Sequence, residues 1–261
     1  MLIALTRAVS PSIGRCELLH VAREPIDVAR AAQQHREYEQ ALVRAGCRVE
    51  HVPAEPGLPD AVFVEDAAVV VDELAVLTRP GAASRRPEVA SVAAALAPYR
   101  PLEAIEAPGT LDGGDVLVLG KQVYVGLGGR TNAEGVRQLT QLLAPHGYQV
   151  RTVEPCGCLH LKSAVTRVGD SIVLVNPAWI DARVFAGVEC LEIEPAEPHA
   201  ANALLVGDTV LAGAQYPRTR DRLDAHGLDV QTIDLSELAK AEGALTCCSV
   251  ILDSWQARSR A

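Results

Sequence analysis

The distribution of apolar residues along the chain predicts a repeated α/β unit. Five times, a stretch with helical character ends in a small turn, and a β-branched run follows that closes at Pro, Glu or Asp. These five segments are residues 45–53, 98–108, 146–154, 186–195 and 226–234. All but the second have glycine just before the strand, where a helix can end in a left-handed residue at little cost. The chain is therefore expected to repeat one supersecondary unit.

Hairpins are predicted between these segments, because pairs of apolar runs flank two-residue polar turns. The turns are Asp72-Glu73, Gly120-Lys121, Gly169-Asp170 and Gly207-Asp208, spaced roughly 40 to 50 residues apart. A fifth hairpin requires residues 247–252 to pair with residues 2–6, which would close the series into a ring. Helical periodicity is present in residues 26–43, 87–96 and 132–143.

Hairpin, helix and strand repeated five times predict one domain over residues 1–261. Its expected architecture is a five-bladed α/β propeller with pseudo-fivefold symmetry, since radial repetition hides the edges of the sheets. The alternative is a doubly wound sheet, which requires single strands alternating with helices and a glycine-rich phosphate loop after the first strand. The sequence has neither feature.

Composition and charge narrow the function. The chain has 261 residues, 49% of them hydrophobic, which is ample for a buried core. A net charge of −9 with scattered basic residues argues against a nucleic-acid partner. No apolar run approaches the length of a membrane span, and the N-terminus lacks a signal-peptide pattern, so a cytoplasmic location is expected. Seven cysteines, an odd number without zinc-ligand spacing, fit a reducing compartment.

Polar residues gather where apolar strands begin or end. The segments are residues 60–66 (DAVFVED), 111–115 (LDGGD), 129–132 (GRTN), 159–163 (LHLKS) and 245–249 (LTCCS). Taken singly they are weak signals, because a free cysteine packs as a small apolar residue and an isolated histidine is usually structural. Adjacent strand residues face opposite sides, so only one of Cys247 and Cys248 is expected to enter a site.

In this order, with residues 78–86 between the first two, these segments resemble those of dimethylarginine dimethylaminohydrolases. The resemblance covers about residues 18–252 and implies membership of the guanidino-group-modifying, or pentein, superfamily of five-bladed α/β propellers. It implies hydrolysis of Nω-methylated arginine, either asymmetric dimethylarginine or monomethylarginine, to citrulline and dimethylamine or methylamine. The reaction would pass through a covalent cysteine thiouronium, without metal or organic cofactor, and a homodimer is left open.

The resemblance also implies residue roles. Cys247 would be the nucleophile, His160 the acid and base, and Asp112 the carboxylate that orients the histidine. The substrate would be held by three further groups of residues: Glu65 and Asp66 at the guanidinium, Asp60 and the Leu18 backbone at the α-amine, and Arg85 and Arg130 at the α-carboxylate.

These residue types suit the charges of such a substrate. A guanidinium is a delocalised cation that needs carboxylate acceptors when buried, and a thiolate is a strong nucleophile for its poorly electrophilic carbon. Planar arginine side chains bind a carboxylate through two hydrogen bonds. Carboxylates near Cys247 should raise the thiol pKa and a bound cation should lower it, so we hypothesise that the substrate assists ionisation of the thiol.

Two other functions are weighed against this one. Arginine deiminases usually carry an acid two residues after the catalytic histidine, where this chain has Lys162, which favours a methylated nitrogen. A non-catalytic propeller that binds a macromolecule, like the ribosome anti-association factor of similar fold, is opposed by the net charge and the complete Cys, His and acid set. Residues 8–23 have the composition of a mobile loop that could close over substrate, or of a passive surface connection.

Overall fold

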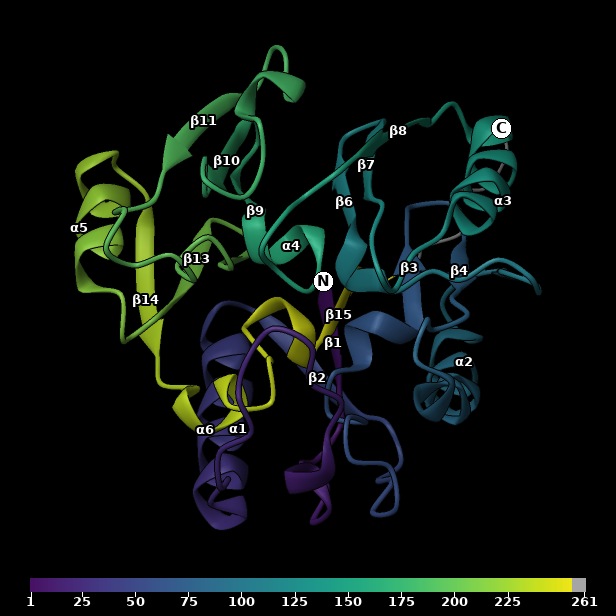
Figure 1. Ribbon diagram of the computed structural model, residues 1–261, viewed down its shortest axis with the longest axis horizontal. Coiled ribbons are helices and arrows are strands. Elements are labelled where there is room, and N and C mark those ends of the chain that lie inside the picture. The colour runs from purple at the N-terminus through teal and green to yellow at the C-terminus, as the bar shows by residue number, and fades with distance from the viewer. Residues whose placement is uncertain (255–261) are drawn as a thin grey trace.

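Five three-stranded sheets surround a common centre (Figure 1) in the computed structural model, which describes residues 1–254. The last seven residues of the predicted domain, 255–261, lie outside the described residues. Separate sheets in a ring confirm the predicted propeller and exclude the single doubly wound sheet. In blade order the strands are β15 (Val250–Asp253), β1 (Leu2–Thr6) and β2 (Cys47–His51); β3 (Ala68–Val70), β4 (Ala75–Leu77) and β5 (Leu102–Ala104); β6 (Val116–Leu119), β7 (Gln122–Gly126) and β8 (Gln149–Val153); β9 (Val165–Gly169), β10 (Ile172–Val175) and β11 (Glu189–Glu192); β12 (Leu204–Val206), β13 (Thr209–Gly213) and β14 (Asp229–Ile233).

Every blade has the same strand topology. Its central strand pairs antiparallel with the first strand and parallel with the third. The antiparallel pairs are the predicted hairpins. The fifth pair joins the two ends of the chain, with Leu2 opposite Asp253 and Leu5 opposite Val250, which confirms the predicted ring closure.

Helices on the outer rim make the crossovers that parallel pairing requires (Figure 1). They are α1 (Val28–Arg44), α2 (Val89–Leu96), α3 (Ala133–Leu143) and α5 (Pro217–Ala225). Asp27 caps α1 by accepting a hydrogen bond from Arg30 N, and Asn132 caps α3 by accepting one from Gly135 N. The glycines expected to precede the third strands have left-handed φ angles: Gly46 94°, Gly147 81°, Gly187 83° and Gly227 85°.

Two sequence predictions are wrong in detail. The fourth blade has no helix between β10 and β11; residues 176–188 contain only a short 3₁₀ turn, η6 (Ala182–Val184). Pro177 has no backbone N–H to donate there, and buried Phe185 packs against Tyr124 with their ring centroids 4.8 Å apart. The last strand begins at Val250, so the predicted strand over residues 247–252 starts three residues late, and Cys247 lies in the 3₁₀ turn η7 (Thr246–Cys248).

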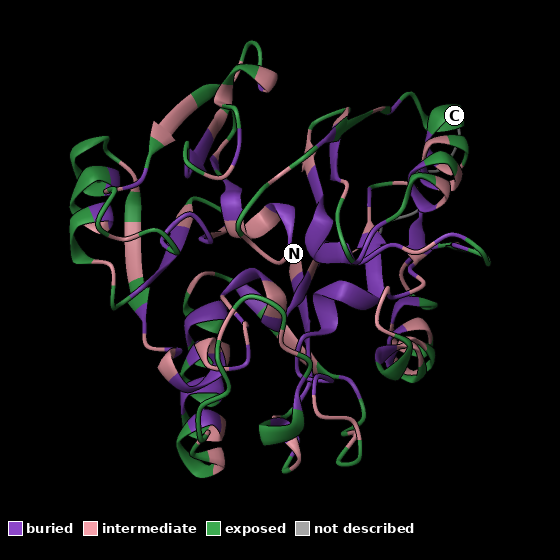
Figure 2. Ribbon diagram, viewed as in Figure 1, coloured by how far each residue is buried: buried purple, intermediate pink, exposed green. Residues whose placement is uncertain are grey.

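Five apolar clusters lie between neighbouring blades, one at each junction of the ring. Figure 2 shows burial concentrated on the inner elements and exposure on the rim helices. The first strands of neighbouring blades contact one another at the centre, as β3 does β15 and as β9 does both β6 and β12. A turn that immediately precedes a first strand is therefore placed near the axis. None of the helices in residues 1–254 combines the length and apolar character of a bilayer span.

Candidate active site

The predicted reactive residues lie in the turns that lead into the first strands of four blades. These turns are η2 (Val64–Ala67) before β3, η4 (Gly113–Asp115) before β6, α4 (Leu161–Ala164) before β9, and η7 before β15. Contacts join η2 to η4 and η7, and α4 to η4. Equivalent positions of the repeat thus bring together segments that are far apart in the sequence.

His160 lies between two carboxylates. Its Nε2 is 3.0 Å from Asp112 Oδ2, and its Nδ1 is 3.9 Å from Asp66 Oδ1. All three side chains are buried. Burial alone would lower the pKa of the imidazole, but the charges of Asp66, Asp115 and Asp112 outweigh it and raise the pKa to about 9. His160 is therefore an imidazolium at neutral pH in the free protein.

Gly114 makes room for this arrangement. A Cβ at this position would lie 2.7 Å from His160 Nδ1 and 2.9 Å from Asp66 Oδ1, so any side chain would displace both. The Gly114 N–H donates a 2.9 Å hydrogen bond to Asp66 Oδ1. Gly114 is thus required by close approach.

Asp112 and Asp115 are fixed by a shared hydroxyl. Thr131 Oγ1 accepts from Asp112 N at 3.2 Å and donates to Asp115 Oδ2 at 2.6 Å. Gly81 N donates to Asp112 Oδ1, while Leu161 N donates to Asp115 Oδ1 at 3.0 Å. Burial raises the pKa of Asp115 to about 6. Asp115 thus holds the start of α4, directly after His160. The sequence analysis gave Asp115 no role, although its place in the Gly-Gly-Asp motif was a signal for one.

Asp66 is held ionised by Arg85. The guanidinium Nη1 is 2.5 Å from Asp66 Oδ2. Burial alone would raise the pKa of Asp66, but His160 and Arg85 outweigh it and lower the pKa to about 2. Arg85 also pairs with Glu88 through Nε and Nη2, and Nη2 donates to the Phe63 carbonyl. Most donors of Arg85 are therefore engaged within the protein, and its expected contact with the α-carboxylate of a substrate stays a prediction.

Asp66, Asp112 and His160 are also the group among residues 1–254 whose geometry could suit a metal ion, with ligand atoms within 4.8 Å of one another. These atoms have other partners. Asp66 accepts from Arg85 and Gly114, and Asp112 contacts His160 and accepts from Gly81. The imidazolium supplies the positive charge between the two carboxylates that an ion would otherwise supply.

Cys247 is half-buried, and its neighbour Cys248 is fully buried. The 3₁₀ turn, rather than strand alternation, separates the two thiols. Cys248 packs in the core with its Sγ 3.4 Å from the Ala244 carbonyl. Burial, followed by the charges of Glu65 and Asp66, raises the pKa of the Cys247 thiol to about 12. Cys247 is therefore a protonated thiol in the free protein.

Glu65 supports the turn that carries Cys247. Its Oε2 accepts from Thr246 Oγ1 at 2.7 Å, and its Oε1 accepts from Lys162 Nζ at 2.6 Å. Asn202 holds the same turn, because its Oδ1 accepts from Thr246 N at 3.1 Å. Both oxygens of Glu65 thus have partners within the protein, and its expected contact with a guanidinium stays a prediction.

The residues expected at the amino-acid end of a substrate are linked by charge. Both oxygens of Asp60 accept from Glu17 N at 3.2 Å, next to half-buried Leu18. Burial raises the pKa of Asp60, while the charges of Arg85 and Arg130 act in the opposite direction. Arg130 is buried, and its Nη1 has no hydrogen-bond partner among the described residues; Asp112 Oδ2 is 3.9 Å away. An unpaired buried guanidinium nitrogen is suited to an anionic ligand.

The chain is similar in sequence and in fold to known proteins. The family profile described as "N,N dimethylarginine dimethylhydrolase, eukaryotic" matches residues 21–185. The N(G),N(G)-dimethylarginine dimethylaminohydrolase of Streptomyces coelicolor is 41% identical over 250 residues, which is 95% of this chain and 96% of the relative. A Pseudomonas aeruginosa structure of this type, a cysteine-to-serine variant complexed with citrulline, is 33% identical with a TM-score of 0.91, covering 95% of this chain and 98% of that one. A dimethylarginine dimethylaminohydrolase adduct with S-methyl-L-thiocitrulline is 32% identical with a TM-score of 0.91, covering 97% and 100%.

The charge of His160 can be tested directly. Nuclear magnetic resonance of protein with ¹³C-labelled histidine should give His160 a pKa of about 9. The Asp112→Asn variant should lower it, because a neutral amide no longer stabilises the imidazolium. Since the folded-state pKa exceeds the unfolded value of 6.5, His160 should stabilise the fold fully below pH 6.5, and this contribution should disappear as the pH rises through about 9. A wild-type pKa below 6.5 would contradict the assignment.

Proposed function

This chain belongs to the dimethylarginine dimethylaminohydrolase family, and we propose that it hydrolyses Nω-methylated arginine to citrulline and dimethylamine or methylamine. The observation that carries the proposal is the position of Asp66. Its carboxylate lies 3.9 Å from His160 Nδ1, and its charge contributes to the high pKa of the Cys247 thiol. The Asp66 carboxylate therefore lies beside the proposed proton donor, His160, and acts on the proposed nucleophile, Cys247. Its negative charge also favours a bound cation.

Binding of the guanidinium would start the reaction. Glu65 and Asp66 make the pocket negative, which disfavours the thiolate until a cation offsets their charge. The bound substrate would lower the thiol pKa and the proton would leave to solvent. Sγ of Cys247 would then attack the guanidinium carbon, forming a carbon–sulfur bond and a tetrahedral adduct.

His160 would move the protons of both later steps. The imidazolium would donate its proton to the methylated nitrogen, the carbon–nitrogen bond would break, and the amine would leave behind a covalent thiouronium. The neutral imidazole would next take a proton from water as its oxygen attacks the same carbon. Breaking of the carbon–sulfur bond, with transfer of the remaining hydroxyl proton to the departing sulfur, would release citrulline and return the Cys247 thiol. Asp112, at 3.0 Å from Nε2, would keep the ring oriented throughout.

The amino-acid end of the substrate would be recognised by charge. We propose that Asp60 and the Leu18 carbonyl accept from the α-amine, and that Arg130 and Arg85 bind the α-carboxylate. The unpaired Nη1 of Arg130 supports this role. Arg85 would contribute through the second hydrogen of Nη1, because the first donates to Asp66 while Nε and Nη2 bind Glu88 and the Phe63 carbonyl.

Arginine deimination is the alternative within the same chemistry. The position two residues after His160 is Lys162, whose ammonium binds Glu65 and the Gly113 carbonyl. This position therefore supplies no carboxylate to accept hydrogen bonds from an unmethylated guanidinium nitrogen of arginine. The buried N–H groups of that nitrogen would lack this partner. This feature favours methylated arginine.

We also propose a cytoplasmic setting and a small-molecule substrate. Seven free cysteines, in a chain whose described helices include no bilayer span, support the cytoplasm. The net charge of −9 supports a small-molecule substrate in preference to nucleic acid.

The proposed activity requires Cys247. Citrulline should form from asymmetric dimethylarginine and monomethylarginine, with arginine far slower, and Cys247→Ser should lower kcat by roughly 10³-fold or more. Cys248→Ala is the matched control, because this adjacent thiol faces the core, and its kcat should stay near wild type. Turnover that persists in Cys247→Ser would remove Cys247 from its role, and faster hydrolysis of arginine would favour a deiminase.

Substrate-assisted ionisation predicts the charge of the thiol. Thiolate absorbance, measured as wild type minus Cys247→Ser, should be absent at neutral pH, because the pKa of Cys247 is about 12. Adding an inert cationic analogue of the substrate should lower this pKa, since the analogue offsets the carboxylates. A thiolate already present at neutral pH in the free protein would contradict the mechanism.

The role of Arg130 predicts a selective loss of affinity. Arg130→Gln should raise KM for asymmetric dimethylarginine by roughly 10- to 100-fold, the cost of a lost charged hydrogen bond. A second substrate is an analogue of asymmetric dimethylarginine that lacks the α-carboxylate. Wild type should already bind this analogue weakly, and Arg130→Gln should leave its KM unchanged. An equal loss on both substrates would show that Arg130 supports the fold instead of the carboxylate.

A further inference from the structure

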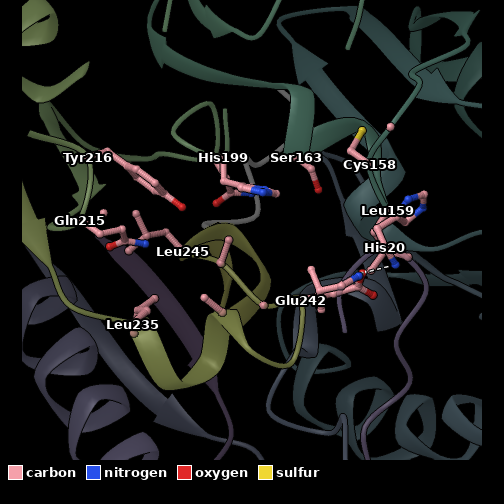
Figure 3. A pocket seen from close by; sticks show the side chains of 17 residues that line it. His20, Cys158, Leu159, Ser163, His199, Gln215, Tyr216, Leu235, Glu242 and Leu245 are labelled. Carbon is pink, nitrogen blue, oxygen red and sulfur yellow. Dashed lines mark hydrogen bonds between the residues drawn. The ribbon is translucent and has the colours of Figure 1, made fainter. Parts of the chain in front are cut away.

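Residues 17–21, in the loop beside the proposed α-amine site, are held by two carboxylates. Asp60 accepts from Glu17 N. Glu242 accepts from three consecutive backbone N–H groups: Leu19 N at 2.9 Å, His20 N at 2.5 Å and Val21 N at 2.9 Å. Figure 3 shows the contact with His20 at the edge of a cavity. Consecutive N–H groups that converge in this way form an anion-binding concavity, which here receives a side chain from the far end of the sequence.

Leu18 packs against the core, but the two residues that follow it lack apolar packing. Leu19 is 58% exposed, and His20 is also exposed. On one side His20 and Val21 line a cavity of about 160 Å³, together with His199, Tyr216 and Leu245 (Figure 3). The loop therefore borders open space, and the charge-assisted bonds to Glu242 are its main attachment on that side.

Glu242 has an unusual backbone conformation. It is the one non-glycine residue in residues 1–254 with a left-handed backbone, at a φ of 57°, where a side chain is disfavoured. The neighbouring Gly243 is pressed against Phe63, since a Cβ there would lie 2.1 Å from the ring. Hydrogen bonds from Glu242 N and Gly243 N to the helix α6 (Ser236–Ala239), at the Ala239 and Leu238 carbonyls, keep the turn in place. Tertiary packing thus holds the carboxylate toward the loop at the start of the segment that leads to Cys247.

We propose that Glu242 is a positioning residue for substrate recognition. By filling the anion-binding concavity of residues 19–21 it holds Leu18 beside Asp60, in the conformation that accepts the α-amine. The inference rests on the proposed function for its substrate. Glu242 has no contact with the groups that break bonds, so its loss should weaken binding and leave the chemical step nearly unchanged.

Three variants test the role. Glu242→Ala should raise KM for asymmetric dimethylarginine by roughly tenfold or more with kcat changed less than about twofold, and Glu242→Gln should be intermediate because its amide oxygen still accepts hydrogen bonds. Glu197→Ala is the matched control. Glu197 likewise accepts from consecutive N–H groups, of Arg218 at 3.0 Å and Thr219 at 2.8 Å, but at the start of α5, so KM should not change.

Added acetate distinguishes positioning from general damage to the fold. An anion that enters the vacated concavity should lower KM of Glu242→Ala toward the wild-type value and leave Glu242→Gln unaffected, since the amide still occupies the site. Unchanged KM in Glu242→Ala, or a loss confined to kcat, would overturn the proposal. If Glu242→Ala does not fold, the same KM measurement on Glu242→Gln tests the proposal.

Limited trypsin digestion gives a readout that needs no turnover. Arg15 and Arg23 are exposed on either side of residues 17–21, and cleavage after them should be faster in Glu242→Ala and slowed again by acetate. Equal cleavage in wild type and Glu242→Ala would overturn the proposed attachment. If wild type forms no citrulline yet cleavage depends on Glu242, the loop attachment stands while the proposed function fails.

Discussion

The burial of an imidazolium between two carboxylates is the interaction on which the rest of this structure depends. Three buried ionised groups are tolerated only when each has partners, because desolvation is costly. Arg85 and Gly114 N satisfy Asp66, while Gly81 N and Thr131 hold Asp112. Glycine at position 114 follows from the same requirement, since any Cβ would enter the cluster.

The propeller is the means by which these groups meet. Each blade places the turn before its first strand near the axis, so short segments from four blades share one centre. Apolar clusters at the five blade junctions fix the ring. Connections on the rim can vary, as the fourth blade shows, because this blade has the same strand topology although no α-helix joins β10 to β11.

The site has two halves with different physical support. Around His160 nearly every polar atom has a buried partner, which suits groups that must keep a fixed geometry while protons move. Around Leu18 the backbone is held by hydrogen bonds to buried Asp60 and half-buried Glu242. Polar contacts of this kind can open without disturbing the core, and a substrate needs such an opening to reach a buried centre.

The sequence by itself determined the repeat, the hairpins, the ring closure and the segments that carry the chemistry. Those features rest on local rules: strand alternation, polar turns, glycine at helix ends and spacing along the chain. Sequence reasoning erred at residues 176–188 and 247–249, where packing against other blades replaced local preference. Only the tertiary structure decided that Asp115 fixes α4, that Lys162 and Thr246 take both oxygens of Glu65, and that Glu242 reaches residues 19–21. Such pairs join different blades, and their geometry and pKa values follow from the closed ring, which no local pattern encodes.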